Sequence, residues 1–230
     1  MKILALDTAT AVAAIAVMED DKPLAEIALE TGRKRGEVMA EAVAGLLQRL
    51  ELRPHDLEAY ALGIGPGSFT GLRSSLAFIK GLALTSPRPV VGVSTLHSLA
   101  LSAVDFKGLV LPVIDARKGE VFTARFRADG RGAVQRESQD VALTPDRILE
   151  MIDGPALLLG DALLRYRALF EQGLKPNAII ALEKLWAPRA INVAALARPR
   201  LQNGESDRID TLVPIYVRAS DAELSLGPRR

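Results

Sequence analysis

The order in which apolar runs follow one another constrains the fold of this 230-residue chain more than any other feature. Three short apolar runs come first, and from Glu37 the apolar residues recur with the period of a helix. Beyond Pro54, strand-like runs alternate with helical segments, which predicts parallel strands joined by helices after an antiparallel opening. The expected strands and helices of this part are residues 3–6, 12–17, 24–29, 37–50, 60–64, 69–84, 90–93 and 94–103.

A second, smaller unit is expected to begin near Phe106-Lys107-Gly108. Both units open with a strand that ends in Asp, followed by a turn and another strand. Thr144-Pro145 suits a helix start, with Thr as the N-cap and Pro at the first helical position. The expected strands of this unit are residues 111–114, 121–127, 133–143, 156–159 and 178–182, followed by further helices. The sequence therefore predicts an α/β protein with a first lobe over residues 1–107 and a second lobe with a C-terminal tail over residues 108–230.

Composition excludes several classes of protein. There is no cysteine, which excludes a disulfide framework, a thiolate nucleophile and a Cys-based zinc site. The 29 basic and 28 acidic side chains leave a net charge of +1, so no general field attracts a polyanion. No run approaches the roughly 20 apolar residues of a membrane-spanning helix, and the start reads as a buried strand rather than a signal peptide. We expect a cytoplasmic protein without membrane contact.

Residues that carry metal or nucleophile chemistry are scarce. His55 and His97 are the two histidines of the chain, 42 residues apart, and neither has a ligand partner three or four residues away. The segment Gly65–Phe69 misses the spacing of a Gly-x-Ser-x-Gly elbow. We therefore predict no metal site and no catalytic residue.

A glycine-rich segment joins one expected strand to the next helix. Its glycines permit positive φ and close backbone approach, and Ser68 or Thr70 can cap the helix. The first N–H groups of the helix could receive an anion, although the spacing matches neither Gly-x-Gly-x-x-Gly nor a P-loop. Anion binding stays open beside the favoured alternative, a structural strand-to-helix turn. The residues of this glycine turn are Gly65, Pro66, Gly67, Ser68, Thr70 and Gly71.

The helix after the glycine turn carries more apolar surface than one core absorbs. Phe78 and Leu82 point away from the face that suits the sheet. Ser74, Ala77 and Gly81 form a smooth patch that would let another helix approach closely. Two alternatives cover Phe78 and Leu82, namely a partner protein or the preceding helix of the same lobe. Both hold if the two helices pair and present a joint surface.

Two acidic turns follow apolar strands, one at Asp7-Thr8 and one at Asp115. A carboxylate after a central strand on each side of a seam between lobes is where Mg²⁺ and a nucleotide phosphate could be held. Neither turn has a glycine directly after Asp or next but one to it, where a loop around a phosphate would require one. The favoured alternative is a pair of hairpin turns whose backbone is capped by Asp.

The chain resembles the bacterial TsaB (YeaZ) family of tRNA threonylcarbamoyladenosine biosynthesis proteins over nearly its whole length. The motifs that carry this resemblance are Leu4-Ala5-Leu6-Asp7-Thr8-Ala9-Thr10, Gly65-Pro66-Gly67-Ser68-Phe69-Thr70-Gly71-Leu72-Arg73, Val91-Gly92-Val93-Ser94-Thr95-Leu96, Ile114-Asp115-Ala116-Arg117-Lys118-Gly119-Glu120-Val121-Phe122 and Pro214-Ile215-Tyr216-Val217-Arg218. The resemblance implies the two-lobed, RNase H-like fold of the actin, sugar-kinase and heat-shock-chaperone superfamily, with mixed sheets flanked by helices.

The resemblance also implies a function. Members of the family are non-catalytic paralogues of the transferase TsaD, which they bind through the two helices of the first lobe. The ATPase TsaE joins the complex, tRNA is reached only through the complex, and ATP or ADP with Mg is expected, if present, at a shared interface. Alone, the chain is expected to form a homodimer. The expected interface residues are Glu37, Val38, Met39, Ala42, Leu46, Ser74, Ala77, Phe78, Gly81 and Leu82.

Two departures from the family patterns bear on chemistry. The transferase carries a His-x-x-x-His metal motif after the strand equivalent to residues 90–93, where this chain has Thr95 and Leu99. Many relatives have His-Ser-Glu before the first helix, where this chain has Arg35-Gly36-Glu37. The alternative function is an Mg-ATP-dependent phosphotransferase or ATPase of the same superfamily, in which Asp7 and Asp115 would position the metal.

Overall fold

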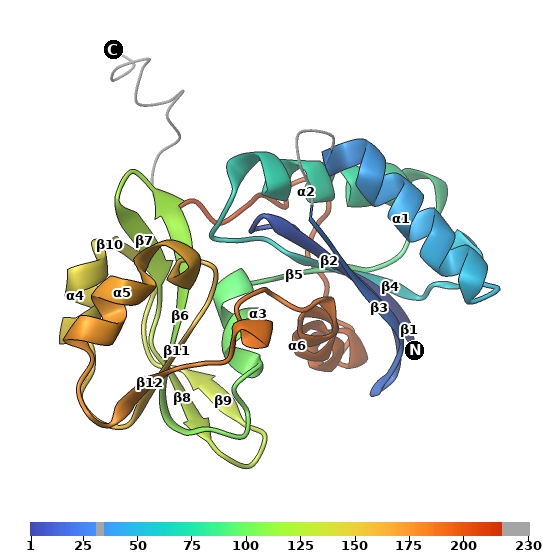
Figure 1. Cartoon of the computed structure of the whole chain (residues 1–230). Helices are drawn as coiled ribbons and strands as arrows, with labels where there is room; N and C mark the ends of the chain where they lie inside the picture. Colours follow the sequence, from blue (N-terminus) through green and yellow to red (C-terminus); the bar gives the residue numbers. More distant parts are fainter. Residues whose placement is uncertain (31–34, 218–230) are drawn as a thin grey trace.

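The computed structural model describes residues 1–30 and 35–217, with the side chains of residues 35–37 left out of the description. It consists of two β-sheets with helices on both sides of each (Figure 1). In this part of the chain, no helix is both long enough and apolar enough to cross a membrane.

The first sheet is formed by β1 (Lys2–Asp7), β2 (Val12–Glu19), β3 (Lys22–Glu30), β4 (Ala59–Gly63) and β5 (Val90–Val93). Its strand order is β3–β2–β1–β4–β5. The first three strands are antiparallel, whereas β1, β4 and β5 run parallel. This confirms the expected antiparallel opening followed by parallel strands.

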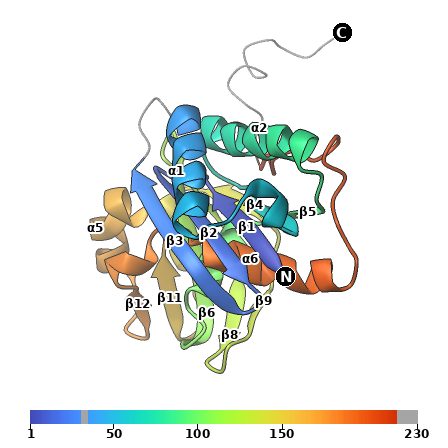
Figure 2. The same ribbon diagram turned by 90° about the vertical axis from the view of Figure 1, so that its right-hand side faces the viewer.

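Helices cover both faces of the first sheet. α1 (Arg35–Arg49) and α2 (Phe69–Thr85) lie together on one face, and α6 (Ala190–Gln202) lies on the other (Figure 2). Successive side chains of β1 point to opposite faces of the sheet, so this strand contributes to both helix layers. Leu4 and Leu6 face α1 and α2, whereas Ile3 and Ala5 face α6. A short 3₁₀ helix, η1 (Pro54–Asp56), precedes β4.

The second sheet is formed by β6 (Lys107–Arg117), β7 (Glu120–Thr123), β8 (Phe126–Asp129), β9 (Val134–Arg136), β10 (Val141–Leu143), β11 (Ala156–Leu159) and β12 (Ala178–Ile180). Its main path is β10–β7–β6–β11–β12, and β8 pairs with β6 and β9. α3 (Thr95–Leu101) covers one face, and α4 (Pro145–Glu150) with α5 (Leu163–Gly173) covers the other. A 3₁₀ helix, η2 (Glu183–Leu185), follows β12.

The C-terminal helix corrects one expectation from the sequence. The sequence predicts that residues 108–230 form the second lobe, but α6 packs on the first sheet. Val193 and Ala197 are fully buried in the same core cluster as Ala5 and Val91. The small side chains of the buried face of α6 let this helix lie close to the sheet. The segment that follows α6 also binds this sheet, because Asp207 N donates to the Val90 carbonyl over 2.7 Å. The division near residues 107 and 108 stays a prediction, whereas α6 belongs with the first sheet.

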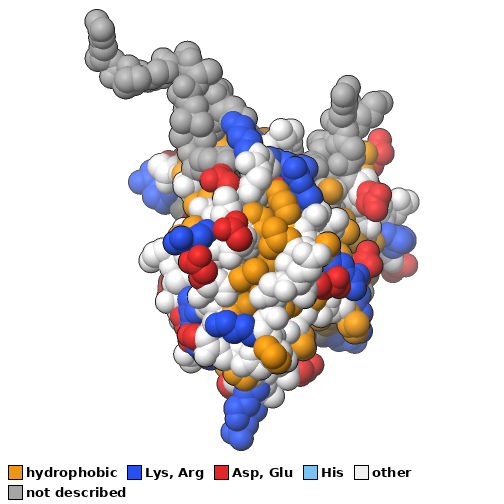
Figure 3. All heavy atoms as spheres, turned by 60° about the vertical axis from the view of Figure 1, so that its left-hand side comes forward, with side chains coloured by type: hydrophobic (Ala, Val, Ile, Leu, Met, Phe, Trp, Pro, Cys, Tyr) orange, Lys and Arg blue, Asp and Glu red, His pale blue; other side chains and the backbone are white. Residues whose placement is uncertain are grey.

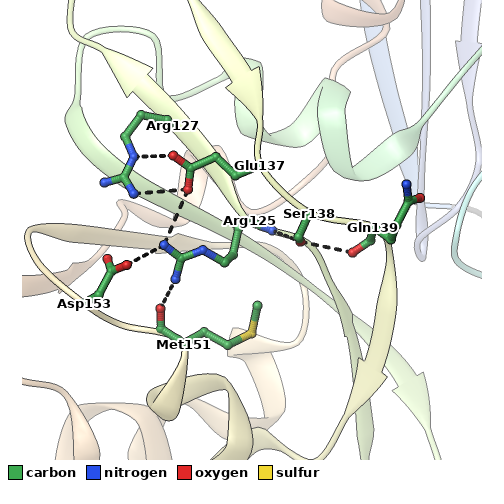
Figure 4. Close-up of polar contacts among 7 residues, drawn as sticks. All are labelled: Arg125, Arg127, Glu137, Ser138, Gln139, Met151 and Asp153. Carbon is green, nitrogen blue, oxygen red and sulfur yellow. Dashed lines mark hydrogen bonds and ion pairs between the residues drawn. The ribbon is translucent and has the colours of Figure 1, made fainter.

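The long strands expected at residues 121–127 and 133–143 are each broken in the structure. Arg125 N donates to Ser138 Oγ over 2.9 Å instead of joining the sheet ladder, which separates β7 from β8. The Arg125 side chain binds the Met151 carbonyl and lies 2.6 Å from Asp153 Oδ2 (Figure 4). These contacts hold the chain between β7 and β8 against the end of α4, so the break follows from contacts that are distant in sequence.

Candidate functional site

A cleft of about 220 Å³ lies between the two sheets. One wall comes from the turn after β1 and the first turn of α2, and the other comes from the β6–β7 hairpin and Asp161. The residues that line it are Ala9, Thr10, Ala11, Gly67, Ser68, Phe69, Thr70, Asp115, Ala116, Arg117, Lys118, Phe122 and Asp161. The cleft therefore lies at the seam where the two acidic turns were expected to meet.

Asp7 does not line this cleft. Its carboxylate is fully buried and accepts hydrogen bonds of 2.9 Å from Ala9 N and from Thr95 Oγ1. A Cβ at Gly63 would lie 2.1 Å from Asp7 Oδ2, so glycine is required where β4 passes the carboxylate. Burial raises the pKa of Asp7 to about 6 from an ordinary value of 3.8. The expected joint site of Asp7 and Asp115 is not formed by the described residues, because Asp7 is directed into the core.

Thr8, the neighbour of Asp7, also has a structural role. Its hydroxyl donates to the Gly71 carbonyl over 2.8 Å and lies 2.9 Å from Ser75 Oγ. Thr8 and Ser75 are both fully buried. Thr8 therefore fixes the first turn of α2 to the end of β1.

Asp115 does lie at the cleft, together with a carboxylate that the sequence reasoning missed. Asp161 Oδ1 accepts a hydrogen bond of 3.0 Å from Asp115 N. The pKa of Asp161 is raised to about 6, mainly because its carboxyl is buried. The negative charge of the nearby Asp115 raises this pKa further. The signal that could have found Asp161 is the apolar run of β11 followed by Gly160-Asp161, which repeats the strand-to-Asp pattern.

The cations near these carboxylates come from the hairpin and from α5. Asp115 Oδ1 accepts a hydrogen bond of 2.8 Å from Arg117 N, and Asp115 Oδ2 lies 3.3 Å from Arg117 Nη1. Arg165 Nη1 lies 4.0 Å from the same oxygen. Among residues 1–30 and 35–217, no group of three His, Cys, Asp or Glu side chains is arranged to hold a metal ion. The acidic pair is thus already balanced by protein cations and backbone donors.

The glycine turn is held by the turn after β1. A Cβ at Gly67 would lie 2.4 Å from the Ala9 carbonyl oxygen, which also accepts a hydrogen bond of 2.7 Å from Ser68 N. Ser68 Oγ caps α2 by accepting from Gly71 N over 3.3 Å. Gly65 has a φ of +100° and is followed by a cis bond to Pro66. These contacts support the structural strand-to-helix turn, while Ser68 and Thr70 also border the cleft.

The predicted interface residues divide into buried and accessible groups. Met39 and Leu46 are each only 1% exposed and belong to the core between α1, α2 and the sheet, so the prediction that they contact a partner is wrong for the chain as folded. Half-buried members are Val38, Ala42, Ser74, Phe78 and Leu82, and exposed members are Ala77 and Gly81. The side chain of Glu37 lies outside the described residues.

Phe78 and Leu82 are covered in part by the chain itself. Both pack against the core cluster that includes Met39 and Val43 of α1. The structure therefore supports the alternative in which the preceding helix covers them, and it leaves each partly accessible. α1 and α2 form a joint surface on one side of the first sheet (Figure 2).

Two glycines on these helices have no close neighbour in the described part of the chain that would require a glycine. A Cβ added at Gly45 of α1 or at Gly81 of α2 would meet none of the described atoms within 4 Å. Glycine inside a helix costs about 1 kcal/mol relative to alanine. Both positions therefore lose helix stability without improving contacts within the chain.

The positions aligned with the transferase metal motif are filled by structural residues. Thr95 is fully buried, and its hydroxyl accepts a hydrogen bond of 3.2 Å from Gly65 N while it donates to Asp7. Leu99 is fully buried in the apolar core beneath α3. Neither position presents a metal-binding atom to the cleft.

Comparisons with known proteins agree on one family. A family model described as TsaD, tRNA N6-adenosine threonylcarbamoyltransferase, matches residues 29–225. The tRNA threonylcarbamoyladenosine biosynthesis protein TsaB of Bacillus subtilis is 30% identical over 97% of this chain and 96% of that protein. TsaB of Escherichia coli is also 30% identical, over 95% of each. YeaZ from Pseudomonas aeruginosa superposes with a TM-score of 0.79 and 26% identity, covering 94% of this chain and 99% of that chain. The comparisons confirm the expected mixed α/β, actin-like fold.

Proposed function

The chain belongs to the TsaB (YeaZ) family of tRNA threonylcarbamoyladenosine biosynthesis proteins, and on that premise we propose that it is a non-catalytic scaffold subunit. In this proposal it docks a TsaD transferase through the joint surface of α1 and α2 and supports that enzyme in its competent state. The TsaE ATPase joins the same complex, and tRNA is contacted through the complex rather than by this chain alone.

The observation that carries the docking proposal is the open space at Gly45 and Gly81. A helix of a partner can approach the backbone closely where no Cβ projects, which increases van der Waals contact along the helix. Ala77 extends the same smooth exposed stripe one turn before Gly81. Contacts with a partner helix in the open space would offset the helix stability that Gly45 and Gly81 cost. A partner therefore gives a reason for these two glycines, which the described contacts within the chain do not require.

The residues in place of the metal motif support a non-catalytic role. The Thr95 hydroxyl is committed to Asp7 and Gly65, and the Leu99 side chain fills the core. Binding a metal at these positions would require breaking both buried contacts. The chain's own residues thus stabilise the joint between the sheets at the point where the transferase is expected to carry its metal ligands.

The alternative, an Mg-ATP-dependent phosphotransferase, loses one of its two proposed residues. Asp7 is directed away from the cleft and Asp115 is balanced by Arg117. Calorimetry of ATP with Mg²⁺ against the purified chain tests this alternative directly. Tight binding accompanied by turnover would replace the scaffold proposal with an enzyme.

The docking proposal is tested with an exposed arginine placed on the smooth stripe. Gly81→Arg is expected to abolish pull-down of the TsaD protein from the same organism while the circular dichroism spectrum stays unchanged. Ala168→Arg, on the exposed face of α5, is the matched control and should bind normally. Retained binding by Gly81→Arg would remove the α1–α2 surface from the proposal. Reconstituted tRNA modification with and without this chain then tests whether the scaffold is required.

A further inference from the structure

Residues 204–217, the crossing segment, run from the end of α6 along the first sheet to the second. Near its start, Asp207 N donates to the Val90 carbonyl of β5 over 2.7 Å. Near its end, Ile215 N donates to the Ile64 carbonyl over 2.7 Å, one residue beyond β4. In Figure 1 this segment, drawn in red, passes above α3 toward the second sheet. The crossing segment is therefore fixed to the first lobe at two points before its last two residues.

Tyr216 attaches the crossing segment to the first turn of α2. Its ring stacks on the ring of Phe69, with centroids 5.1 Å apart and planes inclined by 15°. Arg73 Nε donates to the Tyr216 hydroxyl over 3.2 Å, and the Arg73 guanidinium lies 5.8 Å from the centre of the Tyr216 ring. Tyr216 is 44% exposed, so water competes for these contacts and they stabilise weakly. This attachment can therefore be released without unfolding either sheet.

Val217, the next residue, attaches the crossing segment to the other lobe. It packs against the apolar core between α3 and the second sheet, which includes Ala116 and Phe122. The cleft of about 220 Å³ is lined by Phe69 from the first lobe and by Ala116 and Phe122 from the second. Two adjacent residues thus bind to opposite lobes at the edge of the cleft.

The helix α3 joins the lobes at another place. Its apolar face packs on the second sheet, whereas its polar side chains bind α6 of the first lobe. Asn192 Nδ2 donates to the Ser98 carbonyl and to Ser102 Oγ, each over 2.9 Å. Ser98 Oγ donates to the Arg189 carbonyl over 3.3 Å. Polar contacts between small side chains permit two packed units to rotate slightly against one another, so α3 can serve as a pivot.

We propose that Tyr216 and Val217 form a clasp that holds the two lobes closed over the cleft, and that its release lets the lobes rotate apart about α3. The proposal does not rest on the docking of a partner to α1 and α2. Because the contacts of Tyr216 are weak, the open arrangement is a minor population of about 3%. A ligand that takes the place of Phe69 against the Tyr216 ring shifts the lobes toward the open arrangement.

Pulsed electron double resonance tests the clasp by measuring the distance between the lobes. The chain has no cysteine, so spin labels attach only to cysteines introduced by Glu41→Cys in α1 and Ala168→Cys in α5, two exposed positions. α5 lies on the side of the molecule that Figure 3 brings forward, and α1 lies on the opposite side of Figure 1. An excess of unlabelled chain removes distances between copies. In Tyr216→Ala/Val217→Ala, the ratio of open to closed molecules should rise about tenfold, which raises the population at longer distance from about 3% to about 25%.

Matched variants separate the clasp from other effects. Val213→Ala shortens an apolar side chain of the same segment that is 62% exposed, and it should leave the distances unchanged. Phe69→Leu breaks the stack from the side of α2, so it should open the lobes as Tyr216→Ala does, and combining the two changes should add little. Circular dichroism checks that each variant remains folded. An unchanged distance distribution in Tyr216→Ala/Val217→Ala, or equal opening by Val213→Ala, would overturn the proposal.

Discussion

Thr95 Oγ1 donates a hydrogen bond of 2.9 Å to Asp7 Oδ2, and it joins the first residue of α3 to the last residue of β1. The same hydroxyl accepts a hydrogen bond from Gly65 N at the start of the glycine turn. One buried hydroxyl thus connects the first sheet, the turn that starts α2 and the helix that covers the second sheet. Thr95, which aligns with a metal ligand of the transferase, therefore stabilises the contact between these elements.

Replacing Thr95 with valine should destabilise the protein. Thr95→Val keeps the shape but leaves the Asp7 carboxylate and Gly65 N each without one buried partner, which costs about 1–3 kcal/mol. Urea unfolding followed by circular dichroism measures this difference. Thr85→Val, at an exposed position near the end of α2, is the control and should change stability by less than about 0.5 kcal/mol. Equal stability of the two variants would show that the Thr95 contacts contribute little.

The buried Asp7 carboxyl predicts a stability that falls as the pH rises. Its pKa is about 6 in the folded chain and 3.8 ordinarily, so the folded state binds the proton more tightly than the unfolded state. The corresponding stability is fully present below about pH 4 and is lost as the pH passes through about 6, up to about 3 kcal/mol. Asp7→Asn should remove this part of the decline in urea titrations at pH 4 to pH 7. Asp161, whose pKa is also raised to about 6, leaves a residual decline of the same sign.

Glycines in this chain should respond to alanine in opposite ways. Gly81→Ala should stabilise the isolated chain by about 0.5–1 kcal/mol, because the helix gains propensity and the new Cβ meets open space. Gly63→Ala should destabilise it by about 1–3 kcal/mol or prevent folding, since the Cβ would lie 2.1 Å from Asp7 Oδ2. Thermal unfolding measures both effects: the unfolding temperature should rise for Gly81→Ala and fall for Gly63→Ala. A destabilised Gly81→Ala chain would mean that this glycine serves the fold, and the argument from open space would fail.

The arginine between β7 and β8 should matter more than its neighbour on β8. Arg125 is 21% exposed and binds the Met151 carbonyl and Asp153, whereas Arg127 is 42% exposed and pairs with Glu137 (Figure 4). Arg125→Met should lower the unfolding free energy by about 1–2 kcal/mol, because the carbonyl of the half-buried Met151 loses its donor. Arg127→Met should lower it by less than about 1 kcal/mol. Urea unfolding of both variants decides the order, and the reverse order would contradict this account of the strand break.

Local periodicity was sufficient to predict much of the first lobe. The helices expected at residues 37–50 and 69–84 are α1 and α2 within a few residues, and the helix expected at residues 94–103 is α3, which Ser94 caps. These features depend on neighbours three or four positions away, which the sequence displays directly. Motifs spaced along nearly the whole chain also indicated the family and the fold class, and the comparisons confirmed both.

Contacts between distant segments decided the remainder. The sequence by itself determined that Asp7 and Asp115 follow apolar strands, but only the tertiary structure directs Asp7 into the core and brings Asp161 beside Asp115. The same holds for Met39, which a helical pattern places on an apolar face without saying whether sheet or partner covers it. Periodicity fixes which side chains share a face, whereas the direction of that face depends on long-range contacts. Those contacts put α6 on the first sheet and left Gly81 facing open space.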